Sequence, residues 1–187
     1  MQRTRSTRSD GAARRELLLE AAIRVIAEHG AAALTHRSAA AAAGVPVASA
    51  SYHFPSIDEF RLECYQRSGE RLELALAEVV EYTEQNPEEI PERFGEFVDS
   101  LVGEHRVDMV TVVEMYAAAI HDVRLRPVIE SFAALTAELL GRYLGSAEQG
   151  RAIGEAAGGM ALTRLAVGGN PDELAATVAD MVRRARG

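Results

Sequence analysis

The segment LTHRSAAAAAGVPVASASYHF, residues 34–54, decides the fold that this sequence predicts. Thr35 can cap a helix over residues 36–43, and Gly44 can end that helix in a tight turn. Pro46 can then begin a second short helix, because proline is well tolerated at a helix start. Two short helices joined by a glycine turn are the pattern of a helix-turn-helix unit.

A longer helix precedes this segment. Asp10 can cap its start and Gly30 can end it. Between them, apolar side chains recur on one helical face: Leu18, Leu19, Ala22, Ile23 and Ile26. Residues 1–9 are polar and basic, and we expect them to form a disordered basic arm when the protein is free.

The remainder of the chain also predicts helices. A capping box of Ser56 and Glu59 opens a long helix that ends near residues 86–87. Five more helices follow at about 91–105, 107–122, 124–144, 147–167 and 170–186, and the last starts at Asn170-Pro171-Asp172-Glu173. Because no segment shows sustained alternation of apolar and polar residues, the sequence predicts an all-α fold of about nine helices.

Composition restricts the class of protein. The chain has 187 residues, of which 48% are hydrophobic, which is enough to bury a core. The net charge is −8, yet residues 1–53 hold seven Arg against four acidic residues. A basic end on an acidic body suggests a small surface for a polyanion, and chance asymmetry of a solvated surface is the alternative. With a single cysteine, Cys64, and no apolar run near the roughly 18 residues of a membrane span, we expect a cytoplasmic protein with no membrane partner.

Residues 34–60 resemble the DNA-binding signature of TetR-family transcriptional regulators. The matching residues are Thr35, Arg37, Ala40, Ala43-Gly44-Val45, Tyr52-His53-Phe54, Ser56 and Asp58-Glu59-Phe60. The resemblance implies an N-terminal three-helix helix-turn-helix DNA-binding domain over residues 10–55. It also implies a larger helical domain over residues 56–187 that binds an effector and dimerises.

The DNA contacts are expected on the second and third helices. The candidates are Thr35, His36, Arg37, Pro46, Val47, Ala48, Ser49, Ser51, Tyr52 and His53. Short side chains on the third helix would let its backbone come close to the major groove. The resemblance implies that Arg37, Val47, Ser49 and Ser51 lie nearest to bases, that Thr35, Tyr52 and His53 mainly contact phosphate, and that Ile23, Leu34, Val45 and Phe54 form the small core. We hypothesise that the basic arm lies in the minor groove.

One helix-turn-helix unit contacts only a few base pairs, so we expect a homodimer on a near-palindromic double-stranded operator. The last two helices are the candidate interface, with intrachain packing as the alternative. The candidate residues are Gly154, Gly158, Ala161, Leu162, Leu165, Leu174, Val178 and Met181.

The middle helices are expected to hold a pocket for an unknown small-molecule effector, as the resemblance implies. The candidate lining residues are Phe97, His105, Met109, Val113, Glu114, Tyr116, Ile120, His121 and Phe132. The alternative for each of them is a place in the core, where methionine and aromatic residues at helical spacing usually lie.

These features together predict a sequence-specific transcriptional regulator, a repressor that an effector releases from its operator. An enzyme is not expected, since the sequence has no glycine-rich phosphate loop, no nucleophile elbow and no Cys or His cluster at metal-binding spacing. We therefore expect no metal and no cofactor. The alternative is an all-helical protein-interaction module that has lost DNA binding, which Pro46, Val47 and the absence of lysine keep open.

Overall fold

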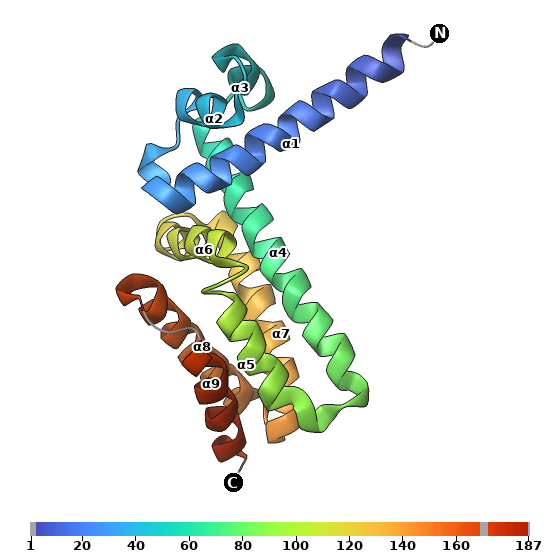
Figure 1. Ribbon diagram of the computed structural model, residues 1–187, viewed down its shortest axis with the longest axis vertical. Coiled ribbons are helices and arrows are strands. Elements are labelled where there is room, and N and C mark those ends of the chain that lie inside the picture. The colour runs from blue at the N-terminus through green and yellow to red at the C-terminus, as the bar shows by residue number, and fades with distance from the viewer. Residues whose placement is uncertain (1–2, 169–171, 187) are drawn as a thin grey trace. The chain divides into compact units, whose positions relative to one another are not determined.

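The computed structural model describes residues 3–168 and 172–186 (Figure 1). Within these ranges the chain forms nine α-helices and three short 3-10 helices, with no strand. The predicted all-α class is therefore confirmed. The predicted start of the last helix at Asn170 and Pro171 lies outside the described residues. The chain divides into two units, residues 1–68 and 69–187, and each is described by itself.

The first unit contains the helix-turn-helix. Its elements are α1 (Arg3–His29), η1 (Ala31–Ala33), α2 (His36–Ala43), α3 (Val47–His53) and the first part of α4 (Ile57–Gln85). Helix α1 begins at Arg3 rather than at Asp10, whereas the disorder of residues 1–9 in the free protein stays a prediction. No glycine or proline interrupts residues 3–9, and arginine has a high helix propensity, so the helix can extend through them.

The core of the first unit is small and largely aliphatic. The apolar face predicted for α1 is buried, and Leu34 joins it. Phe54 stacks on Phe60 with ring centroids 3.7 Å apart and an interplanar angle of 8°. Of the predicted core residues, only Val45 is not fully buried. It directly follows the turn at Gly44 and is half-buried.

Helices α2 and α3 approach each other through alanines. Ala39, Ala40 and Ala50 are each fully buried, so the contact involves no bulky side chain. Gly44 forms the turn between the two helices in the left-handed conformation, with φ 66° and ψ 31°. Residues with a Cβ rarely adopt this conformation, which explains the glycine.

Gly44→Ala is expected to lower the free energy of unfolding by about 1 kcal/mol, because alanine is strained at positive φ. Gly44→Asn is the matched control, since asparagine tolerates this conformation better than alanine does. Urea unfolding of the three proteins measures the difference. A Gly44→Ala protein as stable as the parent would contradict the expectation.

The second unit is built from helices that pair closely. Its elements are the rest of α4, η2 (Pro87–Glu89), α5 (Ile90–Ser100), α6 (Arg106–Ala119), η3 (Val123–Leu125), α7 (Arg126–Leu144), α8 (Ala147–Val167) and α9 (Asp172–Ala185). The most extensive packing is of α7 with α8 and of α5 with α9. A Cβ on Gly150 of α8 would lie 2.6 Å from the carbonyl oxygen of Ala137 on α7. Glycine at this position therefore allows the two backbones to approach.

Two predicted helices are shorter in the structure. Helix α5 ends at Ser100, and the chain then forms turns in which the His105 amide donates to the Ser100 carbonyl at 2.8 Å. Helix α6 ends at Ala119 rather than at Asp122. Among the described residues, none of the helices combines the length and the apolar character that crossing a bilayer requires.

Candidate nucleic-acid interface and ligand cavity

Helix α3 presents most of its side chains to solvent. Tyr52 is 81% exposed and Val47 is 45% exposed, and Ala48 and Ser51 are exposed beside them. Ala50 is the buried residue of this helix. The predicted DNA-contacting residues of α3 thus form an open face, with Ser49 and His53 half-buried at its border.

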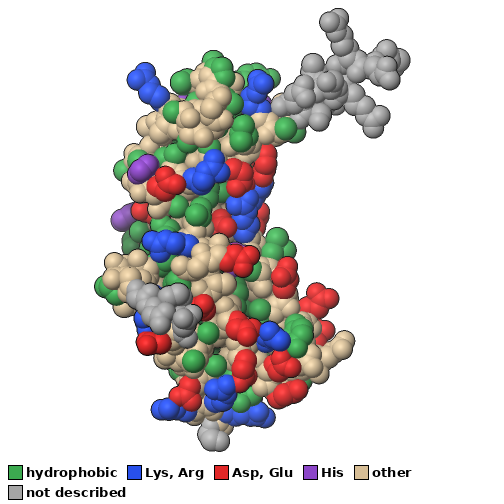
Figure 2. All heavy atoms as spheres, viewed as in Figure 1, with side chains coloured by type: hydrophobic (Ala, Val, Ile, Leu, Met, Phe, Trp, Pro, Cys, Tyr) green, Lys and Arg blue, Asp and Glu red, His purple; other side chains and the backbone are tan. Residues whose placement is uncertain are grey.

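The surroundings of α3 favour a polyanion. No acidic residue occurs between Thr35 and Phe54, and Arg37 on α2 is exposed. Arg37 makes no ion pair within the part of the chain that the structure describes. By contrast, Figure 2 shows many acidic side chains on the surface of the second unit. The segment that carries α2 and α3 therefore places no negative charge of its own beside an approaching phosphate.

Two other arginines of the first unit, Arg15 and Arg67, are paired with carboxylates. Arg15 contacts Glu63 at 2.5 Å, and its guanidinium lies 4.7 Å from the centroid of the Phe54 ring. Arg67 pairs with Glu16. These arginines stabilise the unit and are partly neutralised, which makes Arg37 the basic side chain that α2 and α3 offer to a ligand.

Thr35 is first of all a helix cap. Its hydroxyl accepts a hydrogen bond from the Ser38 amide at 3.0 Å, and the Ser38 hydroxyl accepts one from the Thr35 amide at 2.9 Å. Together they form a capping box at the start of α2. The Thr35 side chain is exposed, but its oxygen is already engaged in this cap.

His36 is turned toward the interior of the first unit. Its Nε2 lies 2.5 Å from the carbonyl oxygen of Phe54, which can only accept, so this nitrogen carries the proton. The ring also stacks on Phe60, with centroids 6.4 Å apart. The Nε2 atom of His36 thus fixes α2 to the end of α3, and the contact of His36 with DNA stays a prediction.

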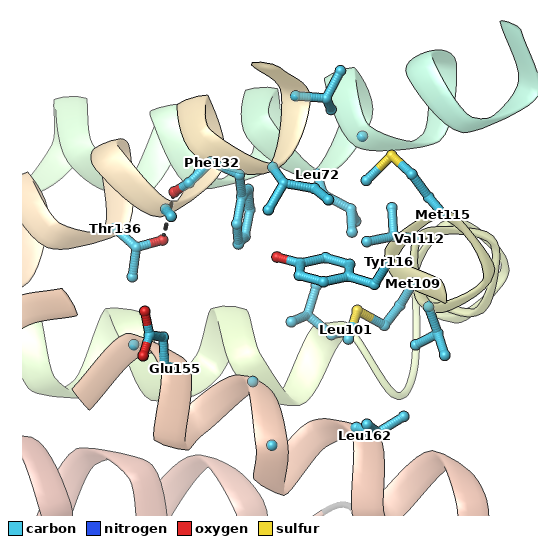
Figure 3. Close-up of a pocket in the computed structure, with 18 of the residues that line it drawn as sticks. Leu72, Leu101, Met109, Val112, Met115, Tyr116, Phe132, Thr136, Glu155 and Leu162 are labelled. Atoms are coloured by element: carbon cyan, nitrogen blue, oxygen red, sulfur yellow. Dashed lines mark hydrogen bonds between the residues drawn. The ribbon is translucent and has the colours of Figure 1, made fainter. Parts of the chain in front are cut away.

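A cavity of about 390 Å³ lies in the second unit, among residues of α4, α6, α7 and α8 (Figure 3). Four of the predicted effector residues line it: Met109, Val113, Tyr116 and Phe132. Leu72, Leu101 and Met115 extend its apolar wall. Its volume suits a small organic molecule.

The other five predicted effector residues do not line this cavity. Phe97 is 6% exposed and packs behind Phe132, with ring centroids 6.2 Å apart. His105 lies in a separate, shallower hollow between α4 and α5. Glu114 is on another face of α6, while Ile120 and His121 follow the end of that helix and are exposed. These five residues are therefore not part of this cavity.

Several of the predicted dimer residues face the interior of their own chain. Ala161, Leu174 and Val178 have at most 1% exposure, and half-buried Gly154 packs against Thr136 of α7. These four residues therefore pack within their own chain, and the dimer contact through the last two helices stays a prediction. The other four predicted dimer residues are at least partly exposed to solvent: Gly158, Leu162, Leu165 and Met181.

Helix α8 borders the cavity as well as the solvent. Gly154, Gly158 and Leu162 line the cavity, as do Arg151 and Glu155. Leu72, Leu101, Arg151 and Glu155 were not among the candidates predicted from the sequence. Glu155 is the charged residue in the run of mostly small residues over 152–161. This unusual position in the sequence could have indicated a functional role for it.

Tyr116 and Glu155 are electrostatically coupled. Burial raises the pKa of the Tyr116 hydroxyl above its usual value, and the negative charge of Glu155 raises that pKa further. Tyr116 is therefore neutral at physiological pH. Among the described residues, no group of His, Cys, Asp and Glu side chains has an arrangement that could hold a metal ion.

Comparison with known proteins agrees with this architecture. Residues 18–64 match the profile of the family described as bacterial regulatory proteins, tetR family. A member of the TetR family from Streptomyces coelicolor A3 is 27% identical, with a TM-score of 0.73 over 92% of this chain and 97% of its own. The multidrug binding protein EbrR, solved with imidazole, is also 27% identical, with a TM-score of 0.69 over 92% of this chain and 94% of its own. No curated protein sequence matches the chain.

A third structure shares the fold at lower identity. It is a candidate transcriptional regulator from Saccharomonospora viridis in complex with choline, which is 19% identical with a TM-score of 0.77 over 92% of this chain and 96% of its own. The fold and the exposed α3 define the class of helix-turn-helix proteins. Within that class, the resemblance to TetR-family transcriptional regulators is confirmed by the profile match and by these structures.

Proposed function

We propose that the protein is a sequence-specific DNA-binding repressor that a small-molecule effector releases from its operator. The observation that carries this proposal is the exposed face of α3, which stands beside Arg37 in a segment free of acidic residues. An α-helix fits the major groove, where side chains reach base edges. Val47, Ala48 and Ser51 are the residues proposed to approach bases, and Tyr52 is proposed to reach a phosphate oxygen.

The proposed repressor acts as a homodimer. Two α3 helices related by a twofold axis would bind half-sites about 34 Å apart, which makes the operator a near-palindrome. The exposed face of α8 is the proposed contact between the two copies, and its small side chains would let two helices approach closely. The residues of this face are Ala152, Ala156, Gly159, Leu162, Thr163 and Ala166.

The cavity in the second unit is the proposed effector site. Its apolar lining and its size of about 390 Å³ support a small organic ligand. The similar protein EbrR is a multidrug binding protein that was solved with ethidium as well as with imidazole. An effector would release DNA by binding better to the conformation that fits the operator less well.

Recovery of the DNA that the protein binds in cells tests the proposal. We expect a short near-palindrome upstream of a small number of genes, and purified protein should bind it in a gel-shift assay. Failure to enrich any sequence, together with no binding to DNA from the flanks of its own gene, would favour the protein-interaction module instead.

Arg37→Ala should weaken operator binding about tenfold or more, since a side chain that reads a base contributes roughly 1–3 kcal/mol of discrimination. Arg126→Ala, on the exposed surface of α7, is the matched control and should bind as the parent does. Fluorescence anisotropy with operator and with scrambled DNA measures both. If Arg37→Ala bound the operator with unchanged affinity, α2 would not face the DNA.

A further inference from the structure

We propose that the cavity of the second unit takes an amphipathic organic cation, and that the Glu155 carboxylate binds its positive charge. This inference rests on the proposed function, because it names the chemical class of the effector. The two ends of the cavity differ in polarity, and each suits one part of such a ligand.

One end of the cavity is apolar and adaptable. In Figure 3, Met109, Val112 and Met115 lie together on the α6 side, with Leu72 and Leu101 next to them. Methionine side chains are flexible and polarisable, so they adjust to differently shaped apolar groups. This end suits a hydrocarbon or aromatic body and offers no partner for a charge.

The opposite end carries the charge. Glu155 extends from α8 on the side of the cavity where Thr136 and Phe132 lie (Figure 3). The Thr136 hydroxyl already donates to the Phe132 carbonyl at 2.9 Å, so it cannot also donate to the carboxylate. Among the described residues, no hydrogen bond or ion pair occupies the Glu155 carboxylate. An acceptor-only group at the edge of an apolar cavity favours a cationic partner.

Tyr116 lies between the two ends. Its ring stands in the middle of the cavity, and its hydroxyl points to the side of Thr136 and Glu155 (Figure 3). The face of an aromatic ring attracts a cation within about 6 Å. Because burial and Glu155 both raise its pKa, Tyr116 keeps its proton and adds no second negative charge.

The positive charge of Arg151 would favour an anionic ligand rather than a cationic one. It lies one turn before Glu155 on α8, and like Glu155 it lines the cavity and is exposed. Arg151 and Glu155 do not form an ion pair within the described part of the chain. Burial and the negative charge of Glu155 both raise the pKa of Tyr116. Figure 3 places the Glu155 carboxylate on the same side of the cavity as the Thr136 side chain and the Tyr116 hydroxyl, and this placement favours the cation.

Three probes of matched shape test the charge of the ligand. They are (4-phenylbutyl)trimethylammonium, its neutral isostere with a tert-butyl group in place of the trimethylammonium, and 6-phenylhexanoate. Dissociation constants are measured by calorimetry on the protein without DNA. We expect the cation to bind at least about tenfold more tightly than the neutral probe.

Variants of Glu155 identify the residue responsible. Glu155→Gln keeps the shape and should remove the preference for the cation without weakening the neutral probe. Glu155→Lys should reverse the preference in favour of the carboxylate. Glu148→Gln, on the same helix but outside the cavity, is the control and should keep the preference for the cation. Circular dichroism verifies that each variant is folded.

Several results would overturn the proposal. They are equal binding of the cation and the neutral probe, tighter binding of the carboxylate by the unmodified protein, and no binding of the cation at millimolar concentration. Since DNA is absent from these measurements, a protein that binds the cation but no operator would contradict only the proposed function.

Discussion

Ser51→Glu is expected to abolish operator binding, with a loss of affinity of at least about a hundredfold. Ser51 is exposed on α3, and its hydroxyl has only a long contact of 3.5 Å to the Val47 carbonyl, so the change leaves the packing intact. Double-stranded DNA carries one negative charge per about 1.7 Å of its axis, and a carboxylate on the inserted helix would be repelled by it. A dimer would suffer this repulsion at both half-sites.

The matched control is Ala134→Glu, which adds the same charge at an exposed position of α7. It should leave operator binding within about twofold of the parent, because charges beyond a Debye length of about 10 Å are largely screened. Anisotropy at several salt concentrations compares the two proteins. Retention of operator binding by Ser51→Glu would show that α3 does not enter the groove.

Gly150→Ala is expected to cost about 3 kcal/mol of unfolding free energy, near the upper end of overpacking effects. The added Cβ would lie 2.6 Å from the Ala137 carbonyl oxygen and 2.8 Å from the Gly141 amide nitrogen. Both atoms belong to the backbone of α7, so they cannot move aside without separating α7 from α8. The loss should appear as a lower midpoint in urea.

A Gly→Ala substitution at another position of α8 should raise the free energy of unfolding instead of lowering it. A Cβ added to Gly159 would meet no atom within 4 Å, so Gly159→Ala gains helix propensity of up to about 1 kcal/mol without a clash. Both proteins are compared at low concentration, where subunit association contributes least. If Gly150→Ala were as stable as Gly159→Ala, the close packing of α7 against α8 would be wrong.

Sequence signals that act locally predicted the helices well. Gly44 and Gly145 end α2 and α7 at the expected residues, and α8 has the predicted bounds. The start of α1 was wrong because residues 3–9 contain neither a strong stop signal nor an apolar face. A possible cap at Asp10 does not by itself prevent a helix from extending further.

The exposure of the candidate residues could be predicted where it follows from helical spacing alone. Helical spacing was sufficient to predict the exposure of Arg37 and of most residues of α3. It failed for His36, whose ring is held by a carbonyl 18 residues further along the chain. Gly154 illustrates the same limit, because only the position of Thr136 on α7 decides which side of α8 faces inward.

The alanine contact between α2 and α3 bears on how this regulator can evolve. Ala50 is the fully buried residue of α3, whereas Val47, Ala48 and Ser51 are exposed, so substitutions at these three positions leave the buried side of the helix unchanged. Under the proposed function, these positions could therefore change to match another operator sequence while Ala50 keeps α3 packed. A small library randomised at these three positions would be a practical source of regulators with new binding sites.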